Sequence, residues 1–325
     1  MKNQIKNIVI LGAILTIGSC TKFDDKLYDA TATAKADPGA VYAELRDLID
    51  DNGWWFWAQE VTSDEIVFPI RGNDWNDGGK WRVLHTHEWT NDVDAVNSMW
   101  SHLYDGVREA NKLIDGLQES AGDPAIDISI AKLKTLRALF MYMVMDNYGD
   151  VPLITSFTNA PEFPTKATRQ EVYDFLVVDM KAAIPLLPLN SNKFAVNKGM
   201  GYTLLAKLYL NAEIYTGNPA YDKAEAVCDS IIGLGIYTLD NTVTAPFSAT
   251  NVNVSENIFT ILFDEFDAQG FRLHMRTLHY LNDKTFGMKV GPWNGFAILE
   301  DHYESYSDGD KRKEEWFLAG QQFDL

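Results

Sequence analysis

Helical periodicity in the middle of the chain most constrains its fold. Apolar side chains recur at three- and four-residue steps from Ala95 to Leu117, and a second such run extends over residues 130–147. The second run ends at Y-G-D-V-P, residues 148–152, where glycine and proline are typical of a helix end. Further helices are predicted over residues 40–50, 169–187, 197–215 and 221–233. The chain is therefore expected to be mainly α-helical.

The last two of these helices resemble a tetratricopeptide hairpin. G-Y-T-L-L-A-K-L-Y-L-N-A is followed by Y-D-K-A-E-A-V-C-D-S-I-I, with Ala206 and Ala224 where the helices must approach closely. The connection through Thr216-Gly217-Asn218-Pro219 is longer than the standard repeat allows, so the hairpin is degenerate. Because such hairpins bury their apolar faces by stacking, residues 95–233 are predicted to form a helical scaffold. Cys228 is interpreted as a small core residue of the second helix.

A tryptophan-rich stretch, residues 60–89, is interpreted as a ligand loop. It combines Trp75, Trp81 and Trp89 with short polar side chains and the glycines at 72, 78 and 79. Flat apolar rings interleaved with acceptors and donors suit a sugar, which has C–H faces and a rim of hydroxyl groups. The alternative is that some of these tryptophans fill the core beneath a long loop.

A second aromatic loop, G-P-W-N-G-F at residues 291–296, is a candidate to complete the site. Stacking on sugar rings is assigned to Trp75 and Trp81, and hydroxyl binding to Arg71, Asn73 and Asp74. Trp293 and Asn294 are the candidates from the second loop. Asp64, in T-S-D-E, is expected to be a polar contact or a cap that holds the first loop.

The N-terminus looks like a bacterial export signal. Lys2 and Lys6 precede an apolar run of about ten residues, too short to span a bilayer, which ends at I-G-S-C. Residues 1–19 are therefore interpreted as a signal peptide, and Cys20 as a lipidated first residue followed by a polar tether, residues 20–38. An ordinary signal peptide with an incidental cysteine is the alternative. Since the chain has only two cysteines, no intrachain disulfide is expected if Cys20 is acylated.

Composition and motifs argue against several functions. The net charge of −18 would repel phosphate backbones, so nucleic acid is not expected as a partner. The sequence lacks a G-x-S-x-G elbow, a P-loop and an H-E-x-x-H helix, and an enzyme is not expected. His85-Thr86-His87 would place two imidazoles on one face of a strand, but no third metal ligand is evident nearby. Asp74 and Asp77 are a weak calcium candidate, so no metal or cofactor is predicted.

Motifs along nearly the whole chain together resemble the SusD/RagB family of Bacteroidetes outer-membrane lipoproteins. The matching segments include A-N-K-L-I at 110–114, L-R-A at 136–138, Y-G-D-V-P-L at 148–153, A-K-L-Y-L at 206–210 and E-N-I-F at 256–259, besides the lipobox at Cys20. The resemblance implies a tetratricopeptide-like scaffold over 95–233 and an irregular ligand-binding region over 235–325, within one domain, 39–325. It also implies lipid anchoring at the outer surface, oligosaccharide binding and a SusC-type TonB-dependent transporter as partner.

Two expectations follow from the comparison with this family. Family members normally continue past D-K-R at 310–312, so the chain looks truncated at its C-terminus. Some members take peptides or other compounds, so a non-glycan nutrient stays open as the ligand. Two other functional classes are also carried forward: a scaffold whose aromatic loops dock a protein, and a glycosidase that would turn over the bound glycan.

Overall fold

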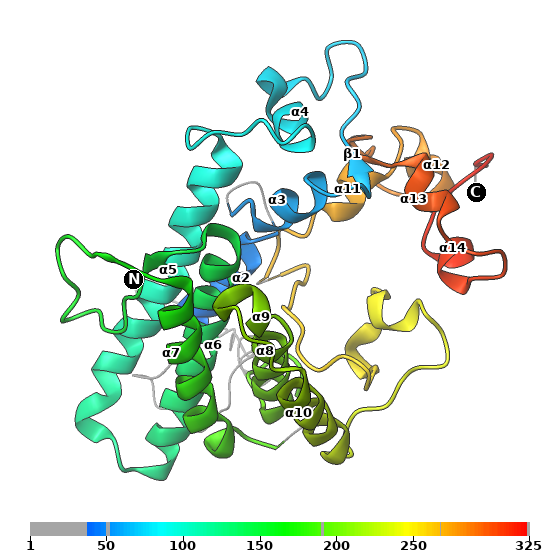
Figure 1. The fold of residues 1–325 in the computed structure, drawn as a ribbon. Coiled ribbons are helices and arrows are strands. Elements are labelled where there is room, and N and C mark those ends of the chain that lie inside the picture. Colours follow the sequence, from blue (N-terminus) through cyan, green and yellow to red (C-terminus); the bar gives the residue numbers. More distant parts are fainter. Residues whose placement is uncertain (1–37, 50–52, 190–191, 267, 324–325) are drawn as a thin grey trace, which may run out of the picture.

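The computed structural model describes residues 38–49, 53–189, 192–266 and 268–323. The predicted signal peptide, Cys20 and nearly all of the predicted tether lie outside the described residues. Helices dominate the described part of the chain, as predicted (Figure 1). The longer helices are α2 (Gly39–Asp47), α3 (Trp55–Val61), α4 (Lys80–His85), α5 (Asp94–Leu117), α6 (Pro124–Tyr148), α7 (Arg169–Ala183), α8 (Lys198–Leu210) and α10 (Tyr221–Gly233).

The remaining elements are short. Five-residue helices are α9 (Ala212–Thr216), α11 (Leu273–Thr277), α12 (Asn282–Phe286), α13 (Glu300–Glu304) and α14 (Lys311–Glu315). Two-residue strands are β1 (Ile66–Val67), β2 (Val151–Pro152), β3 (Lys166–Ala167) and β4 (Ala297–Ile298). The 3-10 turns are η1 (Asp77–Gly79), η2 (Gln118–Ser120), η3 (Ile184–Leu186), η4 (Ala245–Phe247) and η5 (Asn251–Asn253).

Helices α5 to α10 form the predicted scaffold. α5 packs against α6, α6 against α7, and α8 against α10, while α2 lies against α5 (Figure 1). The periodic residues Leu103 and Val107 of α5 and Leu136 and Phe140 of α6 are buried in one continuous core. The α8–α10 pair is the predicted hairpin, and Ala224 is buried where the two helices meet.

Local sequence signals set the ends of these helices. Pro124 begins α6, and the Asp123 carboxylate accepts hydrogen bonds from the backbone N–H groups of Ala125 and Ile126. This cap explains why α6 starts six residues before the predicted apolar run. Thr168 and Glu171 form a capping box at the start of α7. Pro185, in the turn η3, ends the helix earlier than the predicted residue 187, since proline cannot donate the helical hydrogen bond.

A buried polar cluster joins three scaffold helices. Arg137 of α6 donates to Asp179 Oδ2 of α7 (2.6 Å) and to Asn111 Oδ1 of α5 (2.9 Å). Lys134 adds a second ion pair to Asp179 at 3.0 Å, and the Asn111 amide donates to the carbonyl of Ile154. These contacts fix the register of α5, α6 and α7, because a slip of one residue would leave a buried charge without its partner.

The predicted ligand loop, residues 60–89, is largely structured. It contains the end of α3, the strand β1, the 3-10 turn η1 and helix α4. β1 pairs antiparallel with β4, which lies more than 200 residues later, with Ile66 opposite Ile298. The prediction that His85 and His87 share one face of a strand is wrong: His85 is the last residue of α4, and His87 follows it with a positive φ of 58°.

One further expectation is also corrected. Cys228 is exposed, because α10 buries little of its surface and Ala224 is its one buried residue. Residues 251–266 begin with the turn η5 and continue as half-buried irregular chain, where the Thr260 N–H donates to the carbonyl of Lys193.

Candidate functional site

A cluster of aromatic rings lies beneath the candidate site. Trp81 stacks on Phe68 with 3.9 Å between ring centroids, and Trp57 meets Trp81 and Phe296 edge to face. Trp81 is only 2% exposed, and its indole N–H donates to Asp77 Oδ2 at 2.7 Å. The prediction that Trp81 stacks on sugar is therefore wrong. It fills the core, which was the alternative weighed for individual tryptophans of this stretch.

The turn at residues 71–75 rises above this cluster. Arg71 and Asp74 exchange both backbone hydrogen bonds, at 3.1 and 3.2 Å, which closes a tight turn with Asn73 exposed at its tip. Gly72 has a φ of 67°, a left-handed conformation that favours glycine. Trp75 also has a positive φ, 60°, and the bend directs its indole back toward Phe68, 5.2 Å away between ring centroids.

The turn is bound to the second predicted loop, residues 291–296. Arg71 Nη1 donates to the carbonyl oxygens of Asn294 (2.6 Å) and Gly295 (3.0 Å). Trp75 Nε1 donates to the carbonyl of Trp293 at 2.9 Å. The structure thus brings Arg71, Trp75, Trp293 and Asn294 together, with Arg71 Nη1 and the Trp75 indole N–H already donating to backbone carbonyls.

Tyr280 belongs to the same surface and was not predicted. Its hydroxyl donates to Asp74 Oδ2, and this hydrogen bond to a carboxylate raises the pKa of the tyrosine. The side chain is exposed, so a flat ring lies beside the polar tip of the turn. Only the tertiary contact reveals this residue, because H-Y-L-N carries no pattern typical of a binding loop.

Arg276 supports the surface from below. Its guanidinium lies over the rings of Trp57 (4.8 Å), Trp75 (5.6 Å) and Trp293 (5.4 Å), and its side chain is buried. Such cation–π contacts hold the rings in fixed positions. Gly295 completes the fit, since a Cβ there would lie 2.9 Å from both the Arg276 carbonyl and the Trp75 ring.

Two clefts flank the peptide between Trp293 and Asn294. One, of about 630 Å³, is lined by Arg71, His279, Asn294, Glu300, Tyr303 and Trp316 among others. The other, of about 770 Å³, is lined by Phe271, Arg272, His274, Met275, Lys289 and Trp293 among others. Consecutive residues thus face different clefts, and Asn294 reaches this geometry with a φ of 50°. Both clefts combine aromatic faces with polar side chains, as in many ligand sites.

The other predicted site residues divide between the surface and its support. Asn73 and Asp74 are exposed on the turn, whereas Asn294 is mostly buried. Asp64 is exposed, and no hydrogen bond of its side chain is found among the described residues. Its predicted role as a cap is wrong, because Ser63 Oγ instead accepts from the Glu65 N–H at 3.1 Å. Its role as a polar ligand contact stays a prediction.

The two metal candidates from the sequence, the Asp74–Asp77 pair and the His85–His87 pair, differ from the group of ligand-type side chains that the structure brings together. Asp74 accepts from Tyr280 and Asp77 from Trp81, so the two aspartates are engaged by different partners. His87 Nε2 lies 2.8 Å from the carbonyl of Thr62, a structural contact. Among the described residues, one group of three side chains could converge on a metal ion, and it lies elsewhere, between α2 and α5.

The fold is thus a helical-repeat scaffold that carries a surface of aromatic rings and polar side chains. Residues 21–210 match a family model described as starch-binding and associating with the outer membrane. Since this match covers more than half of the sequence, the chain belongs to the SusD-like family, the resemblance stated from its motifs. The description names binding rather than catalysis, in agreement with the expectation of a non-enzyme.

Individual relatives are distant and longer. The chain is 25% identical over 198 residues to the starch-binding protein SusD of Bacteroides thetaiotaomicron. The aligned segment covers 60% of this chain and 34% of that protein. Two solved structures share the fold. A SusD superfamily protein from Parabacteroides distasonis gives a TM-score of 0.73 at 19% identity, covering 87% of this chain and 62% of that one. Surface glycan-binding protein A from B. thetaiotaomicron, in complex with laminarihexaose, gives a TM-score of 0.69 at 20% identity. The match covers 86% of this chain and 61% of that one.

The chain thus spans about a third of the curated starch-binding protein and about three fifths of these two solved structures. No helix among the described residues is both long and apolar enough to cross a bilayer.

Proposed function

We propose that this chain binds an oligosaccharide on the ridge formed by residues 71–75, Tyr280 and 293–294, and in the two clefts beside it. The observation that carries the proposal is the convergence of exposed aromatic rings and short polar side chains from two segments more than 200 residues apart. A sugar offers both complementary features, since its C–H faces pack on aromatic rings and its hydroxyl groups pair with amides and carboxylates.

The residues divide into two roles in this proposal. Tyr280 and Trp316 are the exposed rings that stack on sugar, and Trp293 adds the wall of the second cleft. Asn73, Asp74 and Asn294 bind hydroxyl groups. Arg71 and Trp75 hold the turn in place through their bonds to the backbone of the second segment. Each ligand hydrogen bond should contribute only about 1 kcal/mol net, so a modest affinity is expected.

The biological setting of the proposal comes from the family. We infer a surface-exposed lipoprotein, anchored through Cys20 at the outer membrane, that passes its glycan to a SusC-type TonB-dependent transporter. The family description and the relative bound to laminarihexaose support a glycan as the ligand class. The chain spans only part of these relatives, so their ligands do not by themselves identify its own. The ligand and the partner must therefore be tested with this chain.

The first test is isothermal titration of the whole chain against a panel of plant, microbial and host oligosaccharides. Binding to one class with no product formed would support capture without catalysis. The decisive variants are Trp316→Ala and Trp89→Ala, because the two tryptophans are 43% and 42% exposed and, of the two, Trp316 lines one of the two clefts beside the ridge whereas Trp89 lines neither. Trp316→Ala should weaken binding at least about tenfold, the effect expected from losing one stacked ring, and Trp89→Ala should not.

Other outcomes would redirect the assignment. Equal loss in both variants would contradict the proposed site, and turnover of the sugar would indicate a glycosidase. Silence across the whole panel in a folded sample would favour a non-glycan nutrient or a protein-docking role.

A further inference from the structure

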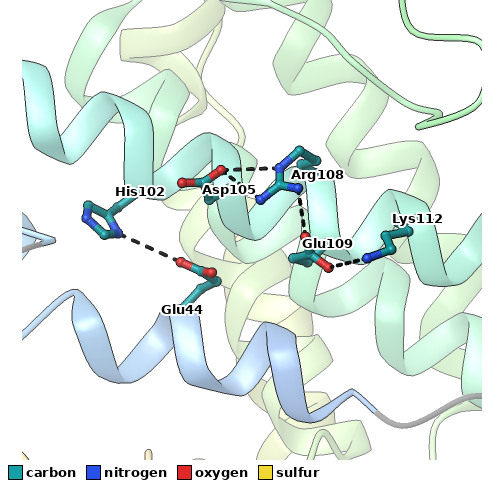
Figure 2. Close-up of polar contacts among 6 residues, drawn as sticks. All are labelled: Glu44, His102, Asp105, Arg108, Glu109 and Lys112. Carbon is teal, nitrogen blue, oxygen red and sulfur yellow. Dashed lines mark hydrogen bonds and ion pairs between the residues drawn. The ribbon is translucent and has the colours of Figure 1, made fainter.

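Three ligand-type side chains converge between α2 and α5, away from the proposed glycan surface (Figure 2). Glu44 comes from α2, and His102 and Asp105 come from α5, where a spacing of three residues places them on one face. One ligand atom of each side chain lies within 4.8 Å of the other two. All three residues are half-buried.

The histidine nitrogen at the centre of this group lacks a hydrogen bond. His102 Nδ1 lies 3.8 Å from Glu44 Oε2, which is too far for a hydrogen bond. The Nδ1 atom is nevertheless buried and has no hydrogen-bond partner among the described residues. Buried polar atoms are nearly always paired, so this nitrogen indicates a position for a further group between the two side chains.

The surrounding charges favour a cation in that position. Arg108 is shared by two carboxylates, through Nη2 to Asp105 Oδ1 (3.1 Å) and through Nη1 to Glu109 Oε1 (2.9 Å). Lys112 contacts only Glu109, at 3.4 Å (Figure 2). Within the described part of the chain, Glu44 forms no ion pair with a lysine or arginine. Three carboxylates, Glu44, Asp105 and Glu109, thus lie near the two cations Arg108 and Lys112, and the ion pairs of these cations go to Asp105 and Glu109 (Figure 2).

We propose that Glu44, His102 and Asp105 bind a divalent transition-metal ion with the ligand preferences of zinc. Imidazole nitrogen and carboxylate oxygen are both zinc ligands, and three protein ligands would leave the fourth tetrahedral position to water. Calcium would require six to eight oxygen ligands, which this group does not offer. Ligand atoms at about 2.1 Å from a tetrahedral ion lie about 3.4 Å apart, so the 3.8 Å separation of Glu44 and His102 needs little adjustment.

The consequence is a link between two helices that is independent of glycan binding. α2 is the first described helix and follows the predicted N-terminal tether. An ion held by Glu44 on one side and by His102 and Asp105 on the other would fasten α2 to the scaffold helix α5. This role goes beyond the proposed function, and it can be tested without knowledge of the sugar.

The test is calorimetric titration of Zn²⁺ into the whole metal-free chain without a histidine tag, with Co²⁺ absorption as a spectroscopic readout. The natural sequence should bind one Zn²⁺, and the ion should raise the melting temperature. His102→Gln should weaken binding at least tenfold and abolish the temperature rise, since even loss of an outer-shell partner costs about 10–100-fold. Glu44→Gln, on the other helix, should do the same.

Two control variants address the other ligands that the chain offers. The double variant His85→Gln/His87→Gln removes the half-buried His85 and the exposed His87 at the end of α4, and Cys228→Ser removes the exposed thiol. Both should retain Zn²⁺ binding and the cobalt spectrum. The proposal is overturned if the natural sequence fails to bind Zn²⁺, or if His102→Gln and Glu44→Gln, folded by circular dichroism, bind it unchanged.

Discussion

The scaffold, α5 to α10, and the aromatic region, residues 53–89 with 271–323, are stabilised in different ways. Scaffold helices have up to 25 residues and meet through apolar stripes that repeat along the sequence. The aromatic region uses helices of five to seven residues, two-residue strands and contacts between segments far apart in the chain. Its order depends on a few large rings and on side chains that bond to backbone carbonyls.

This contrast separates a regular helical framework from an irregular aromatic surface that it carries. In the scaffold, the stability of each helix is spread over many equivalent contacts, while the buried Arg137 cluster fixes the register. In the aromatic region, single residues such as Arg276 and Trp81 contact several neighbours at once. A substitution in the scaffold should therefore lower the stability of the whole fold. A substitution in the aromatic region should instead disturb only the residues around it.

The largest expected effect is from Trp81→Ala. Removing a fully buried indole should cost about 3–5 kcal/mol, because the surrounding rings cannot close the cavity. Hydrogen exchange should rise in residues 54–89 and 273–298 and remain unchanged in α6 and α7. Uniform loss of protection over the whole chain would contradict the comparison.

The next effect is expected from Arg137→Met. This change leaves Asp179 buried with Lys134 as its remaining cation, so the loss of stability should be about 3 kcal/mol, the low end for a broken buried pair. The loss should appear in chemical denaturation as a shift of the whole transition. Arg312→Met, which removes an exposed ion pair to Asp310, is the control and should leave the midpoint unchanged.

The effect of Gly295→Ala should be smaller than these two and confined to the proposed ligand surface. The added methyl would meet the Arg276 carbonyl and the Trp75 ring, and overpacking of this kind typically costs about 1–3 kcal/mol. Glycan affinity should fall while the helical circular dichroism is kept. Gly291→Ala is the matched control, since its Cβ would lie at an ordinary 3.5 Å from the Tyr280 carbonyl. Equal affinities in the two variants would place the sugar away from this ridge.

The smallest effect should be a pH dependence from Asp115. Partial burial raises the pKa of this carboxyl, but hydrogen bonds from Thr158, Ser156 and Phe157 outweigh it and hold the pKa below its usual value of 3.8. The carboxylate thus stabilises the fold above pH 3.8, and this contribution is lost as the pH falls through the lowered pKa. Asp115→Asn should be less stable than the natural sequence at pH 7, with the difference shrinking on acidification. A difference that is constant with pH would show that the charge plays no part.

The apolar periodicity and the glycine stop of the scaffold explain why its helices could be read from the sequence. Both signals are local, and α5 and α10 agree with the predictions to within one residue, whereas the cap at Asp123 starts α6 six residues earlier than predicted. Where predictions failed, a local break was overlooked, as at Asn211, which separates α8 from α9 within the predicted helix 197–215.

The candidate site was predicted only in part. The sequence indicated the two segments and most of the residues that meet, including Arg71, Trp75, Trp293 and Asn294. It did not distinguish a ring that stacks on ligand from one that fills the core, so Trp81 was misassigned and Tyr280 and Trp316 were missed. The group formed by Glu44, His102 and Asp105 was missed as well, because no sequence pattern links α2 to α5.

The sequence by itself thus determined what depends on neighbouring residues: the helical class, the caps, the acidic surface and the supply of aromatic and polar side chains near residues 71–75 and 293–294. The tertiary structure decided which of these side chains are exposed and which are buried. The physical reason is that exposure depends on contacts between residues more than 200 positions apart, such as β1 with β4 and Arg71 with Asn294. Those contacts have no periodic signature along the chain.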